Sequence, residues 1–414
     1  MDPIPLSLPL LMDGAVGTEL RRFGMPADAC TEEWALAHPQ LLLELQRSYA
    51  EAGAAVLVTP TLGANRAALE RFGLSHRMEE FNRELTALTR QAAGSGVLVA
   101  GDLGPTGLHI PPYGETPFEE LVALYAEQAR VLLRSGVDLF LVETVVTMAE
   151  ARAALLGIGQ AGGTVPVWVS CFCDEEGLLP GGTDVLACAI VMQGMGATAF
   201  GLNCVDPRIA QEQLARLHSY LDIPLIAVPS AGLPAREAGG GLLYPETPED
   251  LAARVPALAE AGVRIFGGCC GTRPEHIRAL RQALDRVDFS SLLPVERDPD
   301  VIPCASEKEA RFITPDVDVG ETIRCGPDLL ERILEAEEWP AGALRIAVLE
   351  EDDLSIFAAE QYAIRDALCL WSDVPSLMEG ALRAYQGRAF YDGTAGLDPQ
   401  VLEYLSRRYG LIVL

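Results

Sequence analysis

Three cysteines are the residues of this chain whose types and spacing could do chemistry. Cys269 and Cys270 are adjacent in the stretch GGCCGT, and Cys204 ends the stretch GLNC. Glycines around the cysteine pair permit backbone conformations in which two neighbouring side chains turn to the same side. Three thiolates that leave a fourth position open are typical of a catalytic zinc site. The sequence therefore predicts a zinc site with Cys204, Cys269 and Cys270 as ligands.

Such a site would activate the sulfur of a thiol substrate. A free thiol has a pKa of about 8.5, so only a small fraction of it is ionised at neutral pH, whereas a zinc ion deprotonates a thiol that coordinates it. We expect the substrate sulfur to enter the fourth position as a thiolate and to attack a carbon electrophile.

The other seven cysteines are predicted to be packing residues, because free cysteine is among the most buried residue types. They are Cys30, Cys171, Cys173, Cys188, Cys304, Cys325 and Cys369. Taken alone, Cys269 and Cys270 could also be packing residues. The presence of Cys204 at the end of another predicted strand favours a metal site. In a chain of 414 residues, ten cysteines are more typical of reduced thiols than of a disulfide framework.

Eight short apolar segments before residue 290 must position these cysteines. Each is rich in β-branched or large apolar residues and lacks polar alternation, as in strands buried on both faces. Helix-start signals lie between them, for example Thr116 followed by Pro117 and Glu119. The pattern predicts a (β/α)8 TIM barrel, with an open doubly wound sheet as the alternative. The segments are 10–12, 56–59, 97–102, 139–144, 167–172, 197–203, 224–229 and 264–268.

A barrel places the residues that could take part in a reaction at one rim, because the active sites of such barrels lie at the carboxyl ends of the strands. Asp13 follows the first predicted strand, Glu143 ends the fourth, Cys204 follows the sixth, and the cysteine pair follows the eighth. This position at the rim favours a functional role for both carboxylates, and the alternative is that Asp13 shapes a turn before Gly14 and Glu143 caps the next helix.

The composition excludes several functions. A net charge of −28 argues against nucleic acid and anionic membranes as partners, because lysine and arginine drive binding to both. The only lysine, Lys308, lies outside the segments with the motifs, which excludes Schiff-base catalysis in the main domain. No run of 18 apolar residues and no secretory signal is present, so the expected location is cytoplasmic.

Three ordered motifs, DGAVGTEL (13–20), GLNC (201–204) and GGCCGT (267–272), resemble those of the zinc-dependent homocysteine S-methyltransferases. Four further segments are most similar to the homocysteine module of cobalamin-dependent methionine synthase, and the resemblance spans residues 10–286. These segments are GDLGPTG (101–107), FLVET (140–144), GLLPGGTD (177–184) and AGLP (231–234). The resemblance implies a (β/α)8 barrel that transfers a methyl group to the sulfur of homocysteine and gives methionine.

The same resemblance implies roles for single residues. Cys204, Cys269 and Cys270 would bind the zinc ion, Asp13 and Glu143 would hold the amino group of the substrate, and the backbone at Gly14 would approach its carboxylate. The sequence also departs from the family pattern. Pro60 and Leu62 stand where the family commonly has Asn and Phe, and Ser230 stands where methionine synthases usually carry the Asn associated with the resting zinc site.

The methyl donor implied by the resemblance to methionine synthase is a methylated corrinoid, methylcobalamin, supplied by a separate protein. A sulfonium such as S-methylmethionine is an alternative donor. Two further alternatives are a non-catalytic relative that keeps the zinc barrel and binds a thiol or a corrinoid protein, and a zinc ion that is only structural.

The remainder of the chain is predicted to form a smaller α/β C-terminal domain. Residues 1–287 are assigned to the barrel, the Pro-rich and charged stretch 288–306 to a linker, and 307–414 to the second domain. The last segment, which is too short for a second (β/α)8 barrel, weakly resembles a shortened part of a pterin-binding barrel. Its predicted strands begin near Leu344, Leu368, Arg388 and Gly410, and its predicted helices span 375–385 and 399–409.

Overall fold

The computed structural model describes residues 7–236, 242–293, 295–338 and 342–414, and its main sheet has eight strands. All neighbouring strands are parallel, in the order β1-β10-β7-β6-β5-β4-β3-β2, and a parallel bridge between Met12 and Val56 joins the two ends. The strands are β1 (Leu10–Leu11), β2 (Val56–Val58), β3 (Leu98–Leu103), β4 (Leu139–Val145), β5 (Val167–Cys171), β6 (Ala199–Asn203), β7 (Leu225–Val228) and β10 (Val263–Phe266). The predicted TIM barrel is confirmed.

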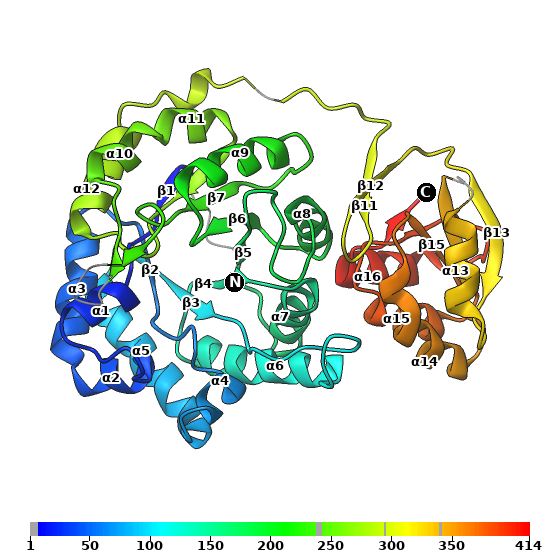
Figure 1. The fold of residues 1–414 in the computed structure, drawn as a ribbon, viewed down its shortest axis with the longest axis horizontal. Helices are drawn as coiled ribbons and strands as arrows, with labels where there is room; N and C mark the ends of the chain where they lie inside the picture. The colour runs from blue at the N-terminus through cyan, green and yellow to red at the C-terminus, as the bar shows by residue number, and fades with distance from the viewer. Residues whose placement is uncertain (1–6, 237–241, 294, 339–341) are drawn as a thin grey trace.

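Helices cover the outside of the barrel (Figure 1). They are α1 (Gly17–Arg22), α2 (Thr31–Ala37), α3 (Pro39–Glu51), α4 (Arg66–Glu70), α5 (Met78–Ala93), α6 (Phe118–Arg134), α7 (Met148–Gln160), α8 (Val185–Gly194), α9 (Pro207–His218), α10 (Pro248–Ala253), α11 (Val255–Glu260) and α12 (Pro274–Leu284). Thr147 caps α7 by accepting a hydrogen bond from the Glu150 amide. The predicted Thr116 cap is wrong, because α6 begins at Phe118 with Pro117 at the N-cap position.

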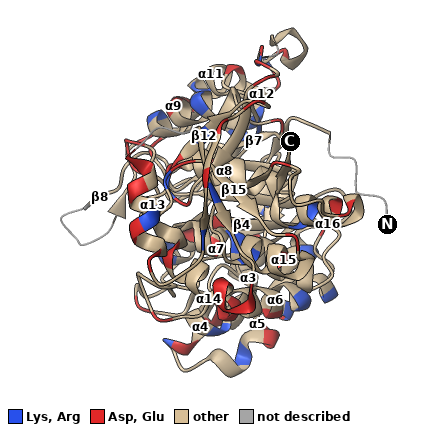
Figure 2. Cartoon of the chain, turned by 90° about the vertical axis from the view of Figure 1, so that its right-hand side faces the viewer, with Lys and Arg blue, Asp and Glu red and all other residues tan. Residues whose placement is uncertain are grey.

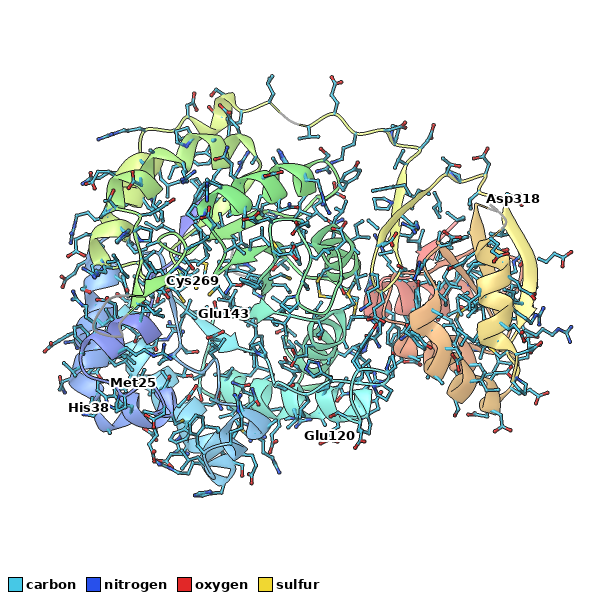
Figure 3. The ribbon with its side chains drawn as sticks, in the orientation of Figure 1. Met25, His38, Glu120, Glu143, Cys269 and Asp318 are labelled. Atoms are coloured by element: carbon cyan, nitrogen blue, oxygen red, sulfur yellow. The ribbon has the colours of Figure 1, made fainter. Side chains whose placement is uncertain are left out.

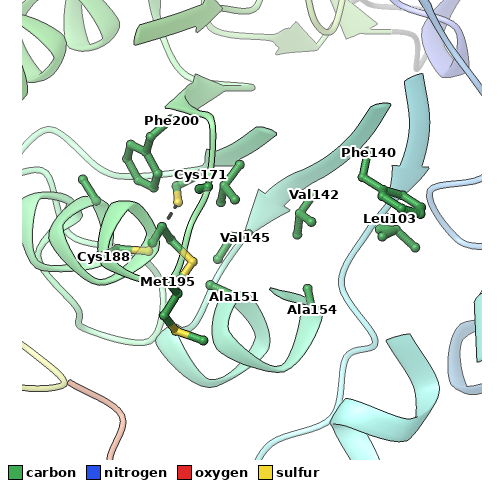
Figure 4. Packing of buried hydrophobic residues seen from close by; sticks show 14 of the residues in the cluster. Leu103, Phe140, Val142, Val145, Ala151, Ala154, Cys171, Cys188, Met195 and Phe200 are labelled. Atoms are coloured by element: carbon green, nitrogen blue, oxygen red, sulfur yellow. Dashed lines mark hydrogen bonds between the residues drawn. The ribbon is translucent and has the colours of Figure 1, made fainter. Parts of the chain in front are cut away.

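Two apolar layers hold the barrel together. Large buried side chains such as Leu141, Trp168 and Ile265 fill its interior. Between the strands and the helices, Cys171 and Cys188 pack with Phe200, and their two sulfurs are 3.8 Å apart (Figure 4). The seven cysteines assigned to packing lie as predicted: all are buried except the half-buried Cys325.

The C-terminal part is a second, smaller α/β unit with a five-stranded sheet, also as predicted. Its strands are parallel and follow chain order: β13 (Val319–Arg324), β14 (Ala343–Ala347), β15 (Leu368–Trp371), β16 (Phe390–Tyr391) and β17 (Ile412–Val413). Its helices are α13 (Leu329–Glu337), α14 (Glu351–Glu360), α15 (Pro375–Ala384) and α16 (Pro399–Tyr409). An antiparallel hairpin, β11 (Ile302–Ala305) and β12 (Ala310–Ile313), precedes the sheet, so β11 lies within the stretch expected to be linker.

Direct contacts join the two units. Arg152 on α7 is fully buried, which lowers the pKa of its guanidinium to about 10, and its Nη2 donates to the Leu382 carbonyl at 2.8 Å. Arg383 pairs with Glu119 on α6, with 2.6 Å between Nη2 and Oε2. The hairpin contributes Lys308, whose Nζ donates to the Gly181 carbonyl at 2.7 Å. The barrel therefore meets the second unit along α6, α7, the loop after β5 and α8.

Charged residues of both signs are interspersed on the face of the molecule seen in Figure 2. The first turn of α14 is acidic, with Glu351, Asp352 and Asp353. Among the described residues, none of the helices has both the length and the apolar character that a membrane span requires.

Candidate metal and substrate site at the barrel mouth

The three predicted cysteine ligands lie together at the carboxyl ends of β6 and β10. The Cys270 sulfur is 3.9 Å from the sulfurs of both Cys204 and Cys269, and all three sulfurs lie within 4.8 Å of one another. Zinc–sulfur bonds of about 2.3 Å in a tetrahedron place neighbouring sulfurs about 3.8 Å apart. The donor set therefore fits a zinc ion in both chemistry and spacing.

The backbone around these cysteines is unusual at two positions. Cys204 has a φ of +58°, a left-handed conformation that is uncommon for residues other than glycine, and Gly271 has a φ of +80°. Gly267 and Gly268 have no such φ, so the expected conformational freedom is used only at Gly271. Gly268 is needed for close packing instead, because a Cβ there would lie 2.5 Å from the Thr272 hydroxyl oxygen.

Hydrogen bonds among the three thiols shift their pKa values in opposite directions. Hydrogen bonds from Cys204 and Cys269 lower the pKa of the Cys270 thiol to about 3. Hydrogen bonds with Cys204 and Cys270, together with burial, raise the pKa of Cys269. One sulfur of the cluster is thus anionic at neutral pH, which is the state that a metal ligand requires.

Asn203, which the sequence interpretation missed, fixes the position of Cys204. Its Nδ2 donates to the Cys204 sulfur at 3.6 Å and to the Thr144 hydroxyl at 2.7 Å. Its Oδ1 accepts hydrogen bonds from the Thr144 amide and the Ser170 hydroxyl, both at 3.0 Å. Thr144 also has a left-handed backbone, with a φ of +57°. Asn203 therefore ties the ends of β4, β5 and β6 together directly beneath the cysteines.

We predict that Asn203→Leu weakens zinc binding by roughly 10- to 100-fold, because groups that orient metal ligands typically contribute this much to affinity. Competition with a chelating dye measures the affinity. Ser170→Ala is the control, since it removes one hydrogen bond to Asn203 and leaves the contact with the Cys204 sulfur in place. An unchanged zinc affinity in Asn203→Leu would show that Cys204 needs no such support.

Carboxyl groups crowd the rim beside the cysteines. Figure 3 shows Glu143 close to Cys269 at the barrel mouth. Asp13 is buried, and its Oδ2 accepts a hydrogen bond from the Val58 amide at 2.9 Å. Burial, and next the negative charge of Cys270, raise the pKa of Glu143 to about 7. Burial likewise raises the pKa of Asp13, with Glu143 as its main unfavourable neighbour.

Asp102, at the end of β3, is a third carboxyl group that the sequence interpretation missed. It lies within hydrogen-bonding reach of Glu143, and burial together with the charges of Glu143 and Asp13 raises its pKa. Its Oδ1 is buried and has no hydrogen-bond partner among the described residues. Three carboxyl groups that repel one another in a buried place would be stabilised by a cationic ligand. The rim is thus suited to an ammonium group.

We predict that Asp102→Asn stabilises the protein by about 1–3 kcal/mol at pH 8, because it removes the negative charge of a buried carboxylate that lies near the carboxylates of Glu143 and Asp13. The folded-state pKa of Asp102 is raised, so its contribution to stability falls as pH rises from about 4 towards that pKa. The gain in the variant should therefore be larger at pH 8 than at pH 5. Urea unfolding at both pH values checks this, and a variant that loses stability at pH 8 would contradict it.

Gly14, predicted to approach a substrate carboxylate, has a structural role as well. A Cβ at this position would lie 2.7 Å from Cε1 of Tyr49, whose hydroxyl donates to the Ala15 carbonyl at 2.7 Å. The Thr272 hydroxyl donates to the Cys269 carbonyl at 2.7 Å and accepts from the Ala15 amide at 3.1 Å. The loop with Asp13 and Gly14 is thereby held against the loop with the cysteine pair.

Tyr244 is a further residue at the site that the sequence interpretation missed. Its ring packs so closely on Gly271 that a Cβ there would lie 2.2 Å from the Tyr244 Cγ. Its hydroxyl lies near the Cys270 sulfur, and burial, followed by the charge of that sulfur, raises the pKa of Tyr244 to about 12. Ser230 is buried near the same loop, and its amide donates to the Val205 carbonyl at 3.0 Å.

Known proteins with similar sequences were found among the methionine synthases. The chain is 32% identical over 303 residues to the methionine synthase of Mycobacterium leprae (strain TN), a match that covers 69% of this chain and 25% of that protein. Identity to the methionine synthase of Mycobacterium tuberculosis (strain ATCC 25618 / H37Rv) is also 32%, over 293 residues, covering 66% of this chain and 24% of that protein. The matched region is therefore about a quarter of the length of these relatives.

Among solved structures, the metallated form of the homocysteine methyltransferase MmuM from Escherichia coli is similar to this chain. The TM-score is 0.56 and the identity 27%, over 66% of this chain and 95% of that one. The sequence model of the homocysteine S-methyltransferases matches residues 10–284, which include every strand of the barrel and all three site cysteines. The chain therefore belongs to the homocysteine S-methyltransferase family.

Proposed function

We propose that this protein transfers a methyl group to the thiol of homocysteine and so forms methionine. The observation that carries the proposal is the cluster of three cysteine sulfurs within 4.8 Å of one another, on the same rim as Glu143, near the end of β4, and Asp13, which follows β1. Homocysteine has a thiol and an ammonium group a few bonds apart. A thiolate-rich centre beside a group of carboxylates matches both groups of that one molecule.

Each residue has a defined task in this reaction. Cys204, Cys269 and Cys270 would hold a zinc ion, which supplies a positive charge that keeps the substrate thiol deprotonated at neutral pH. Glu143 and Asp13 accept hydrogen bonds from the substrate ammonium and so fix the orientation of its sulfur. The backbone at Gly14 meets the substrate carboxylate.

The chemical step is a displacement at the methyl carbon. The thiol of homocysteine loses its proton to solvent, a bond forms between its sulfur and the methyl carbon, and the bond between that carbon and the donor breaks. The donor leaves with the bonding electron pair. Pre-orientation of the sulfur by the carboxylates lowers the entropic part of the barrier.

A methylated corrinoid carried by a separate protein is the donor that we favour. The similarity to the mycobacterial methionine synthases at 32% identity supports it. Those proteins are about four times as long as the matched region, so most of their length lies outside this barrel and is available to carry the donor. A sulfonium such as S-methylmethionine is the second candidate. It is favoured by the match to Escherichia coli MmuM, 95% of which the similarity covers, so a homocysteine methyltransferase can consist almost entirely of this barrel.

Assays with zinc-loaded protein and L-homocysteine distinguish the donors. One assay contains methylcobalamin bound to a corrinoid protein, a second contains S-methylmethionine, and the methionine formed is quantified by mass spectrometry. Formation of methionine with the first donor supports the favoured reaction, and formation only with the second selects the sulfonium reaction. Binding of homocysteine without methionine from either donor would contradict the proposed catalysis and favour a non-catalytic thiol-binding protein.

A further inference from the structure

Thr272, the last residue of the GGCCGT stretch, stands between the loop with the cysteine pair and the loop with Asp13 and Gly14. Its side chain is fully buried. Its hydroxyl donates to the Cys269 carbonyl at 2.7 Å and accepts from the Ala15 amide at 3.1 Å. Because both partners belong to the chain itself, this hydroxyl does not touch a substrate. Any effect that it has on the reaction must pass through the two loops that it joins.

On the side of the cysteines, Thr272 closes the turn that presents them. The Thr272 amide donates to the Cys269 carbonyl at 3.0 Å, so residues 269–272 form a β-turn. Gly271, the third residue of this turn, has the left-handed φ of +80° that is typical of that place in a type II turn. The Cys269 carbonyl thus receives both the amide and the hydroxyl of Thr272, which fixes the peptide between Cys269 and Cys270.

On the side of the expected substrate loop, the same side chain packs against glycines. A Cβ added to Gly14 would lie 3.0 Å from the Thr272 hydroxyl oxygen, and one added to Gly268 would lie 2.7 Å from Thr272 Cγ2. The Gly268 amide also donates to the Asp13 carbonyl at 3.1 Å. The two loops therefore meet without room for a further side chain, and Thr272 sets the spacing between them.

Tyr49 on α3 supports the same junction. Its hydroxyl donates to the Ala15 carbonyl at 2.7 Å and also reaches the Thr272 carbonyl at 3.3 Å. Tyr49 is fully buried as well. Ala15 is thus held at its amide by Thr272 and at its carbonyl by Tyr49, next to the two residues expected to bind the substrate.

We propose that Thr272 is a positioning residue that sets the distance between the cysteine cluster and the loop that binds the amino-acid end of the substrate. One homocysteine molecule must reach both places through a short chain of atoms, with its sulfur at the cysteines and its charged groups at Asp13 and Gly14. A shift of either loop therefore weakens the binding of homocysteine, but not of a thiol that contacts the metal centre alone. This inference rests on the proposed function, and its test measures binding rather than methyl transfer.

Isothermal titration calorimetry on the zinc-loaded protein tests the proposal with two thiols. L-Homocysteine carries a thiol, an ammonium and a carboxylate group, and 1-propanethiol has the same chain with the thiol alone. Thr272→Val keeps the shape of the side chain and removes the hydroxyl, so the Ala15 amide loses this partner. We expect the variant to bind homocysteine about tenfold more weakly than the unaltered protein does, and 1-propanethiol equally well. Thr272→Ser keeps the hydroxyl and should restore the binding of homocysteine.

Tyr49→Phe is the second variant, and it keeps the proposal testable if Thr272→Val does not fold. It removes the other hydroxyl of the junction and should weaken the binding of homocysteine in the same selective way. Unchanged affinity for homocysteine in the folded variants overturns the proposal, and so does an equal loss of affinity for both thiols, since the hydroxyl would then support the metal centre alone. If the unaltered protein itself did not bind homocysteine, the proposed function would fail together with this inference.

Discussion

Replacement of Cys269 by alanine is expected to abolish stoichiometric zinc binding and to lower the rate of methionine formation by at least about a hundredfold, because even groups that only orient metal ligands contribute 10- to 100-fold. The variant leaves two cysteines of a cluster whose sulfurs are spaced for a tetrahedral centre. Without the metal, the substrate thiol keeps its ordinary pKa of about 8.5 and is mostly protonated at pH 7. Zinc content is measured by mass spectrometry of the purified protein, and rates by methionine formation.

Cys325→Ala is the matched control for that variant. Cys325 is also a half-buried free cysteine, but it lies in the C-terminal unit beyond β13. The control should retain one zinc ion per chain and an unchanged rate. If Cys269→Ala also retained its zinc and its rate, the cysteine cluster would not be the centre of the reaction.

Replacement of Glu143 by glutamine is expected to raise the KM for homocysteine by roughly 10- to 100-fold, since a charge-assisted hydrogen bond to the substrate ammonium becomes a neutral one. The effect on kcat should be smaller, because the zinc ligands are unchanged. Glu120→Gln, an exposed position on α6, is the control and should leave KM unaltered. An unchanged KM in Glu143→Gln would mean that the ammonium group binds elsewhere.

The pH dependence of KM gives this variant a second test. The pKa of Glu143 is raised to about 7, chiefly by burial, so this carboxyl is ionised above pH 7 and increasingly neutral below it. KM in the unaltered protein should therefore rise as pH falls through about 7. In Glu143→Gln the rise should be shallower, because only Asp13 and Asp102 remain to titrate. Parallel pH profiles for the two proteins would contradict the role of Glu143.

Much of the barrel could be predicted because its strands are buried on both faces and read as short apolar runs. The ends of β3, β4 and β6 lie within about two residues of the predicted ones. Parallel strands in a barrel share one rim, so the placement of Cys204, Asp13 and Glu143 near the cysteine pair followed from their positions after strands. This inference required only the order of the strands along the chain, and not the positions of the side chains.

Residues whose roles depend on unusual backbone geometry could not be predicted in this way. Asn203 acts through the left-handed conformations of Thr144 and Cys204, and local sequence does not signal these conformations in residues other than glycine. Asp102 sits in a strand that is buried at every residue after the first, where no polar alternation marks the side that faces the site. Tyr244 reaches Cys270 from a loop, and no periodicity indicates where a loop folds back.

The hairpin β11–β12 was missed for a related reason. Its first strand, which contains Pro303, follows a Pro-rich and charged stretch that reads as linker. The strand is specified by contacts far along the chain: the Arg388 amide donates to the Ala305 carbonyl at 2.8 Å, and the Tyr385 hydroxyl reaches the same carbonyl at 3.2 Å. Tertiary contacts thus override the local composition.

X-ray absorption at the zinc edge, with and without L-homocysteine, tests the central claim most directly. The account predicts three sulfur neighbours and one lighter atom around the zinc of the free protein, and four sulfur neighbours after homocysteine is added. Such a change would place the substrate sulfur in the centre formed by Cys204, Cys269 and Cys270. A zinc environment that homocysteine leaves unaltered, or a purified protein that binds no zinc, would contradict the account.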